Sequence, residues 1–311
     1  MPDVAMHHYF GQEVFSGLPA EIQKDLTESV YTFGLYGPDP WFTYQIWKPR
    51  REGRGRRMHT TKTGAFLMSL ARHAREGTSG REMFSYLAGF LCHYALDSVT
   101  HPYIIWQTTE TWPTKRAHRD LEHALDIRLL QREGFQGGKH DLTDHHFPPL
   151  RLPEKMRTDL DKAYREVYGW KNCWAALNRC YRLYRLLFRI MEMPRSPLTM
   201  LVDLFPTPGM KSLPHAKCAF LNRDVENLSH QPWHEPFARE MTFTESFPEL
   251  YAQAVSEAVR MITACHAWMR REISGEELAR CLGNRSYLSG LDVNDPRNFL
   301  VRSLQPPKEK S

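Results

Sequence analysis

The chain has 311 residues, 41% hydrophobic and 25% charged, an ordinary globular composition that excludes disorder as its global state. Its net charge of +5 is matched by the stretch 48–57 alone, where six basic residues stand against Glu52. Because the remainder is nearly neutral, the sequence offers one basic loop but no basic face for duplex nucleic acid. No run reaches the roughly 18 apolar residues that span a bilayer, so no transmembrane segment is expected.

The first residues, 1–12, lack the apolar core of a signal peptide, which predicts a cytoplasmic location. Six cysteines are present, and none forms a Cys-x-x-Cys pair. In a cytoplasmic chain they are expected to be buried thiols rather than disulfides.

Helical patterns are common and strand patterns scarce, which predicts an all-α fold. Apolar spacing predicts helices over 20–32, 64–76, 81–100, 114–132, 154–193, 244–271 and 275–282. We expect His101-Pro102 to end the helix over 81–100, because the residue before proline disfavours the α region. Residues 134–153 and 193–231 are predicted to be irregular.

No linker compels a division of the chain into several units. We therefore predict a single domain over residues 1–305, with a motif-bearing part at 1–130 and a helical C-terminal part at 150–305. A disordered tail, 306–311, is expected to follow.

Three polar residues of the apolar helix share one face. His93, Asp97 and His101 stand at i, i+4 and i+8, which aligns two imidazoles and a carboxylate. A buried aspartate between two histidines is well explained by a bound cation. His118 and Glu122 repeat the spacing on the next helix. Five nitrogen and carboxylate ligands without thiolate favour zinc, with manganese or iron as alternatives.

Each element also has a plainer interpretation. A single His-x-x-x-Asp pair is usually a surface pair, and His93 could be a core histidine bonded to Asp97. Two such stripes together make the metal site the preferred interpretation. Asp126 continues the second stripe, but a carboxylate without a ligand role is the plainer assignment. Four further histidines are not assigned as ligands: His123, His140, His145 and His146.

Further motifs occupy the first 130 residues. They are the opening segment 1–11, Gly37-Pro-Asp39-Pro-Trp-Phe42, Arg57-Met-His59, the segment 84–103 with His93-Tyr-Ala-Leu-Asp97 and His101-Pro-Tyr, and His118-x-x-x-Glu122. Together they resemble the zinc-dependent phospholipase C family, which is related to the plant and fungal zinc nucleases. The resemblance implies an all-α fold, a cluster of up to three zinc ions in a cleft, and phosphodiester hydrolysis.

The resemblance also implies a division of the ligands among the metals. One zinc would be bound by Asp39, His59, His93 and Asp97, a second by His101, His118 and Glu122, and a third by His7 with Asp97 as the bridge. Asp39 would orient or deprotonate the attacking water.

Three of these ligands depend on the resemblance. From the residues alone, Asp39 would be a turn residue, His59 an exposed one and His7 part of a frayed terminus. His7 is preferred to His8 because its offset from Phe10 fits the family spacing. In secreted members a processed N-terminal tryptophan ligates the third metal. Since Met1 stands six residues before His7, the third site is expected to be absent, weak or differently ligated.

The implied function is that of a zinc-dependent phosphodiester hydrolase similar to phospholipase C, in which a metal-bound hydroxide attacks phosphorus in a two- or three-zinc cluster. The substrate would be a phosphodiester, with phospholipid in peripheral membrane contact as one candidate. The arginines over 50–57 could draw an anionic substrate, although a solvated loop is the plainer interpretation. The alternatives are a nuclease-like phosphodiesterase and a non-catalytic protein stabilised by metal. Eight candidate ligands are too many for one closed structural site, which favours an enzyme.

Overall fold

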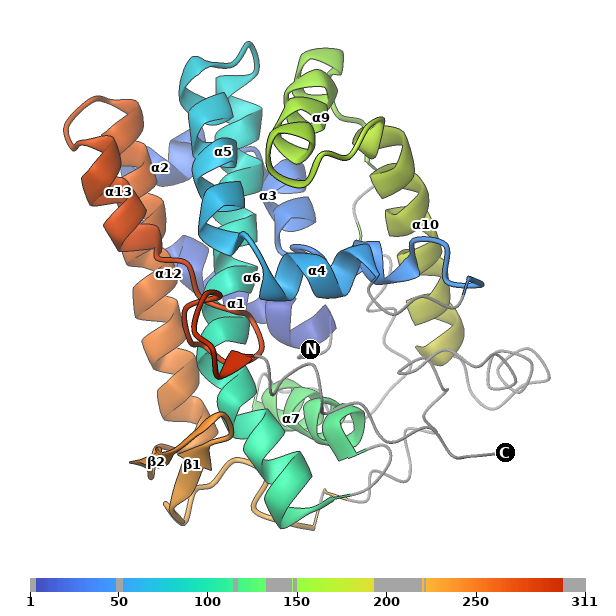
Figure 1. Ribbon diagram of the computed structural model, residues 1–311, viewed down its shortest axis with the longest axis vertical. Helices are drawn as coiled ribbons and strands as arrows, with labels where there is room; N and C mark the ends of the chain where they lie inside the picture. Colours follow the sequence, from blue (N-terminus) through green and yellow to red (C-terminus); the bar gives the residue numbers. More distant parts are fainter. Residues whose placement is uncertain are drawn as a thin grey trace.

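The computed structural model describes residues 4–48, 53–113, 117–132, 147, 150–192, 220 and 222–298. Within these residues the chain forms eleven α-helices and one two-stranded hairpin, which confirms the all-α prediction (Figure 1). The α-helices are α1 (Val4–Gly17), α2 (Ala20–Asp25), α3 (Glu28–Gly34), α4 (Arg54–Thr60), α5 (Thr63–Glu76), α6 (Gly80–Trp106), α7 (Ala117–Arg132), α9 (Glu154–Tyr168), α10 (Cys173–Glu192), α12 (Phe247–Met269) and α13 (Gly275–Leu282). A 3₁₀ turn, η1 (Asp39–Thr43), a π turn, η2 (Gln107–Thr111), and strands β1 (Trp233–Glu235) and β2 (Ala238–Phe243) complete the described elements.

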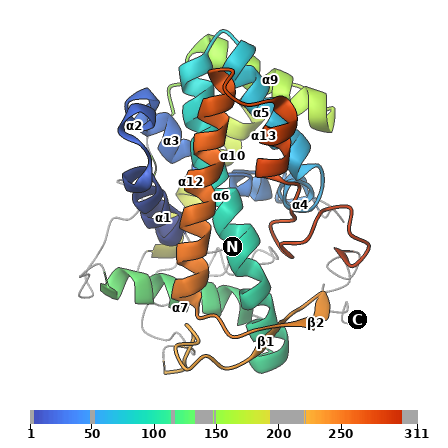
Figure 2. The same cartoon turned by 90° about the vertical axis from the view of Figure 1, so that its left-hand side faces the viewer.

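Helix α6 runs through the centre of the molecule. Every residue of α6 from Met83 to Ile105 is buried, and α1, α3, α5 and α12 pack around it. Figure 2 shows α12 alongside α6, with the β1–β2 hairpin next to the C-terminal end of α6. A helix buried on all sides must be apolar on all sides, which explains the sequence of α6 and isolates the few charged groups that it carries.

Two glycines allow α3 and α6 to cross at close range. A Cβ atom on Gly34 would lie 2.9 Å from the Cα atom of Gly89. A Cβ atom on Gly89 would overlap the carbonyl oxygen of Tyr31. The backbones therefore touch directly, which brings the chain after α3 to the face of α6 that carries His93.

The expectation that His101-Pro102 ends the helix is wrong, because α6 continues to Trp106 with Pro102 inside it. Proline lacks an N–H group, so the carbonyl of Ser98 loses its usual donor four residues on. The backbone of Gly290 lies against this carbonyl, and a Cβ atom there would stand 2.6 Å from the oxygen. Tertiary packing thus outweighs the local preference of the proline, and His101 stays in register with Asp97.

Two other predicted helices are each divided in two. The helix predicted over 20–32 breaks at Leu26 and Thr27, where the extended Thr27 donates its N–H to Oγ of Ser85 at 2.8 Å. The helix predicted over 154–193 breaks after Tyr168, where Gly169 has φ +71° and Asn172 has φ +51°. Left-handed residues of this kind end helices.

Some of the remaining predictions are confirmed, and others concern residues outside the described ranges. The helices predicted over 64–76, 244–271 and 275–282 are confirmed as α5, α12 and α13, and α12 begins at a capping box between Ser246 and Glu249. Helices α1 and α4 and the hairpin were not predicted. The irregular stretch 193–219, most of 134–153 and the tail 306–311 lie outside the described residues.

The single-domain assignment over 1–305 stays a prediction. The five cysteines in the described ranges carry no disulfide, as expected, and Cys218 lies outside them. Among the described helices we find none with the length and apolar character of a membrane span.

The helix crossing yields a first prediction. Gly89→Ala should lower the free energy of unfolding by about 3 kcal/mol, because the new methyl group meets backbone atoms that cannot rotate away. Urea denaturation of the variant and the unmodified chain measures the change. Gly275→Ala is the control, since its Cβ atom would stand 3.7 Å from Nε1 of Trp268 in ordinary contact. Equal stability of the Gly89 variant and the unmodified chain would contradict the prediction.

Candidate metal centre

The eight residues singled out in the sequence converge from five elements. They are His7 on α1, Asp39 on η1, His59 on α4, His93, Asp97 and His101 on α6, and His118 and Glu122 on α7. Seven are buried, and only His118 is partly exposed among them. His59 and His7 thus lie inside the molecule, neither at an exposed loop nor at a frayed end.

Within these eight residues, three groups could each hold a metal ion. The ligand atoms within a group all lie within 4.8 Å of one another. The groups are His7, His93 and Asp97; Asp39, His59 and His93; and His101, His118 and Glu122. This is close to the division that the resemblance implies, with His93 shared between two groups.

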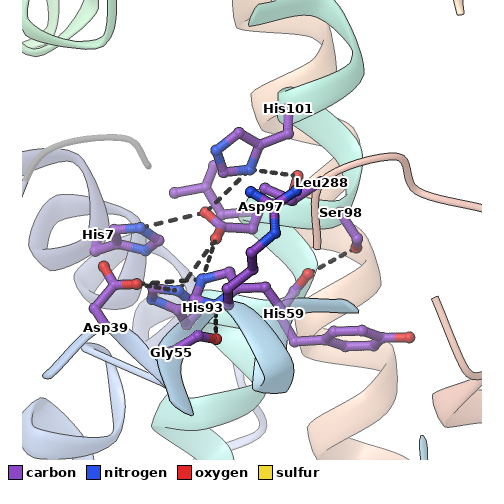
Figure 3. Close-up of polar contacts among 12 residues, drawn as sticks. His7, Asp39, Gly55, His59, His93, Asp97, Ser98, His101 and Leu288 are labelled. Atoms are coloured by element: carbon purple, nitrogen blue, oxygen red, sulfur yellow. Dashed lines mark hydrogen bonds and ion pairs between the residues drawn. The ribbon is translucent and has the colours of Figure 1, made fainter. Parts of the chain in front are cut away.

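The carboxylate of Asp97 stands at the centre of the cluster (Figure 3). Its Oδ1 lies 3.4 Å from Nε2 of His7 and 3.7 Å from Nδ1 of His101. Its Oδ2 lies 3.2 Å from Nε2 of His93 and 3.7 Å from Nε2 of His59. Four imidazoles therefore face one carboxylate, two on each oxygen.

These atoms are buried yet have no hydrogen-bond partner among the described residues. They include both carboxylate oxygens of Asp97, Oδ1 of Asp39, and Nε2 of His59, His93 and His101. Each such group costs about 1–3 kcal/mol when it is left unsatisfied. A set that converges on the same small volume fits a cation, which would coordinate their lone pairs together.

The second ring nitrogen of three histidines is fixed by the main chain. Nδ1 of His93 donates to the carbonyl of Leu35 at 2.9 Å, and Nδ1 of His59 donates to the carbonyl of Gly55 at 2.8 Å. Nδ1 of His101 donates to the carbonyl of Asp97 at 3.2 Å. Since Nδ1 then carries the proton, Nε2 presents a lone pair to the cluster, the arrangement usual for histidine ligands.

A tight turn carries Asp39 to His93. Gly37 has φ +48°, and a Cβ atom there would stand 2.5 Å from Cγ of His93, so only glycine fits without displacing the ligand. Oδ1 of Asp39 then lies 3.5 Å from Nε2 of His93 and 3.3 Å from Nε2 of His59. The Tyr184 hydroxyl donates to Oδ2 of Asp39 at 3.4 Å.

The third group joins α6 to α7. Oε1 of Glu122 lies 2.9 Å from Nε2 of His118 and 3.5 Å from Nε2 of His101. The rings of His101 and His118 are parallel, with centroids 5.6 Å apart. Because the His118 side chain is 41% exposed, this group is the one with a ligand at the surface.

Burial and neighbouring charges shift the pKa values of these residues in both directions. Burial alone would raise the pKa of Asp97, but the charges of His93 and His101 hold that pKa well below its ordinary value. Burial lowers the pKa of His101 to about 3, and burial together with His93 lowers the pKa of His7. For His93, burial is outweighed by Asp97 and Asp39, which raise its pKa.

The basic stretch does not behave as a solvated loop where it is described. The guanidinium carbon of Arg54 lies 4.0–4.8 Å from the ring centroids of Trp41, Tyr44 and Trp170. These cation–π contacts stabilise the packing of the start of α4 against the turn that carries Asp39. Arg50 and Arg51 lie outside the described residues.

The other candidate residues fall outside the three groups. Nε2 of His8 lies 3.0 Å from the side-chain amide of Gln12, and Asp126 is buried on α7. His123 also lies on α7. His140, His145 and His146 are outside the described residues.

Sequence patterns missed two tyrosines. Tyr184 bonds to Asp39, and the ring of Tyr287 lies 5.0 Å from that of His59. A lone tyrosine has no characteristic spacing from a ligand 145 or more positions away, so no sequence signal could have identified either one.

A family model described as zinc-dependent phospholipase C matches residues 6–176, more than half of the chain. The chain belongs to the zinc-dependent phospholipase C family. The family assignment made from the motifs is thereby confirmed. The match contains all eight candidate ligands and ends in α10. No curated protein and no solved structure matches the chain.

The burial of His101 yields a prediction for the zinc-free protein. The unfolded chain takes up the His101 proton near the ordinary pKa of about 6.5, whereas the folded chain takes it up only near 3. Between these pH values the unfolded state binds more protons, so the free energy of unfolding should fall as pH falls, by up to about 1.4 kcal/mol per unit for this group. The raised pKa of His93 acts in the opposite sense, but only above its ordinary value.

Urea denaturation at about pH 4.5 and about pH 7.5 measures this dependence. His101→Asn should make this dependence shallower, because asparagine does not titrate, while the lowered pKa of His7 preserves part of it. An unchanged pH dependence in the variant would show that other groups cause the loss of stability.

Proposed function

We propose that the protein is a phosphodiester hydrolase of the phospholipase C type that uses two zinc ions, or three. Membership of the zinc-dependent phospholipase C family and the three groups of ligand residues support zinc-dependent phosphodiester hydrolysis in general. The observation that carries the proposal is the carboxylate of Asp97, which is fully buried, lacks hydrogen bonds on both oxygens and faces four histidines. A buried charge of this kind calls for a cation.

We assign the ligands as follows. Asp39, His59 and His93, together with Asp97, would hold one ion. A second ion would be held by His101, His118 and Glu122. His7 would hold a third, with Asp97 as the bridge. When bound, zinc lowers the pKa of a coordinated water towards about 7 and thereby supplies a nucleophile for attack on phosphorus.

The protein residues would position the reactants. Oδ1 of Asp39 faces the ligand nitrogens, while Oδ2 accepts from Tyr184. This split allows one oxygen to orient the attacking water, or take its proton, while the other stays anchored. The partly exposed His118 suggests that substrate approaches from the side of α7.

Phospholipid is the substrate that we favour. Phe42, 42% exposed, lies on the turn that begins at Asp39, with its ring centroid 5.0 Å from that of His59. Trp47, 71% exposed, follows shortly after in the chain. An exposed aromatic ring beside the proposed phosphodiester site, as Phe42 is, suits acyl chains in peripheral contact with a membrane. The same rings could stack on bases, which keeps a nuclease-like activity as the alternative. A cytoplasmic location stays a prediction.

Asp97→Asn tests the proposal. The purified chain should contain about two or more zinc ions and hydrolyse a phosphodiester, and the variant should lose zinc and activity together, because asparagine cannot offer two anionic oxygens. Zinc is measured by atomic emission. Activity is measured side by side on phosphatidylcholine, single-stranded DNA and a chromogenic phosphodiester.

The matched control is Asp25→Asn, because Asp25 also pairs with a histidine, its Oδ2 lying 3.1 Å from Nε2 of His266, but outside the three groups. It should keep both zinc and activity. Cleavage of DNA in preference to lipid would favour the nuclease alternative. Zinc content without turnover of any substrate would favour a non-catalytic role.

A further inference from the structure

The loop that follows α13, residues 283–298, lies against the candidate metal centre. It comes more than 100 positions after the end of the family match at residue 176. In Figure 1 this red segment crosses in front of α6 near the end of α4. Its contacts there involve two of the candidate ligands, His59 and His93, and residues that neighbour the ligands.

The loop completes the hydrogen bonds of α4. The carbonyl of His59 accepts from the N–H of Tyr287 at 2.9 Å and from Oγ of Ser286 at 3.4 Å. His59 stands in the last turn of a seven-residue helix, where carbonyls have no partner within the helix. So short a helix is not stable by itself, and its end is held by the loop.

The Tyr287 side chain packs directly on the ligand rings. It is 2% exposed, and its ring centroid lies 5.0 Å from that of His59 and 5.9 Å from that of His93. With Nδ1 of His59 bonded to the carbonyl of Gly55, Tyr287 restricts the remaining freedom of the imidazole to tilt. The orientation of Nε2 in the cluster therefore depends on this contact.

The loop is itself firmly attached to the helical core. Oδ1 of Asn284 accepts from the N–H of Gly64 at 3.1 Å, and the N–H of Arg285 donates to the Tyr94 hydroxyl at 2.8 Å. The guanidinium of Arg285 pairs with Glu257 of α12. These contacts reach α5, α6 and α12, so the position of the loop is set by the core rather than by the ligands.

A further attachment uses the proline of α6. Gly290, with φ +67°, lies over the carbonyl of Ser98 that Pro102 leaves without a helical donor. The loop thus sits on α6 one residue after Asp97. An alanine at this point would force the loop away from α6 without touching a ligand.

We propose that the loop 283–298 is a positioning element for the group of Asp39, His59 and His93, and that Tyr287 is its principal residue. The loop acts through His59, which lies on α4. Neither of the other two ligand groups contains a residue of α4. The group of His101, His118 and Glu122 is built from α6 and α7, so it does not require α4. This inference rests on the proposed binding of zinc by these residues.

The test is site-selective loss of zinc from the full-length chain. Tyr287→Ala should weaken zinc binding at Asp39, His59 and His93 about 10- to 100-fold, the usual effect of removing a residue that supports a ligand, and leave zinc bound at His101, His118 and Glu122. Tyr287→Phe should retain all the zinc, because the ring and the backbone N–H remain. Zinc stoichiometry by atomic emission, followed by competition with a chromogenic chelator, measures both quantities.

Two further variants separate positioning from general stability. Gly290→Ala should reproduce the selective loss, although it changes no atom near His59. Phe247→Ala removes an equally buried ring, 2% exposed, from the start of α12 and should lower stability without altering zinc content. If Tyr287→Ala fails to fold, Gly290→Ala decides the question.

The outcomes are distinguishable. An unmodified chain that binds no zinc would overturn the proposed function. An unmodified chain that binds zinc, with every loop variant binding as much and as tightly, would overturn the positioning role alone. Equal loss from all sites, with the same loss in Phe247→Ala, would also overturn it, since the loop would then act only on global stability.

Discussion

A carboxylate that is closed off from solvent, with no hydrogen-bond partner among the described residues on either oxygen, is the constraint on which this molecule is built. Asp97 lies in the middle of a helix that is buried on every side, and histidines from α1, α4 and α6 itself close around it. An isolated charge in such a place costs several kcal/mol. His93, Asp97 and His101 are the only Asp, Glu, His, Lys or Arg residues between Met83 and Ile105, so the proposed zinc cluster would compensate for all of them.

Bringing those histidines together requires local departures from regular structure. Gly34 and Gly89 let two helices touch backbone to backbone, and Gly37 turns the chain back against the ring of His93. Pro102 stays inside the helix, where its missing N–H leaves a carbonyl that Gly290 then covers. Each departure lies on, or packs against, the part of α6 from Gly89 to Pro102 that carries the three candidate ligands, and special residues are expected around a functional site.

The sequence predicted what depends on helical period and not what depends on contacts across the chain. His93, Asp97 and His101 could be identified because a spacing of four residues aligns side chains in any helix. Asp39, His59 and His7 belong to separate elements with no fixed spacing, so only the family motifs indicated them. The break at Thr27 depends on Ser85, and the persistence of the helix past His101 depends on packing around it. Local sequence patterns do not predict either of these contacts, because the contacts join residues that are far apart in the chain.

Three of the imidazoles that face the cluster, those of His93, His59 and His101, donate from Nδ1 to the carbonyl groups of Leu35, Gly55 and Asp97. A carbonyl is present at every position whatever residue stands there. The tautomer of these three histidines is therefore set by the path of the main chain, and substituting the side chain of a single partner does not remove it. The hydrogen bonds of these three rings would therefore survive substitution of the residues that supply the carbonyls, provided that the helices keep their mutual positions, whereas the packing of the rings against Tyr287 and Gly37 would not survive every substitution.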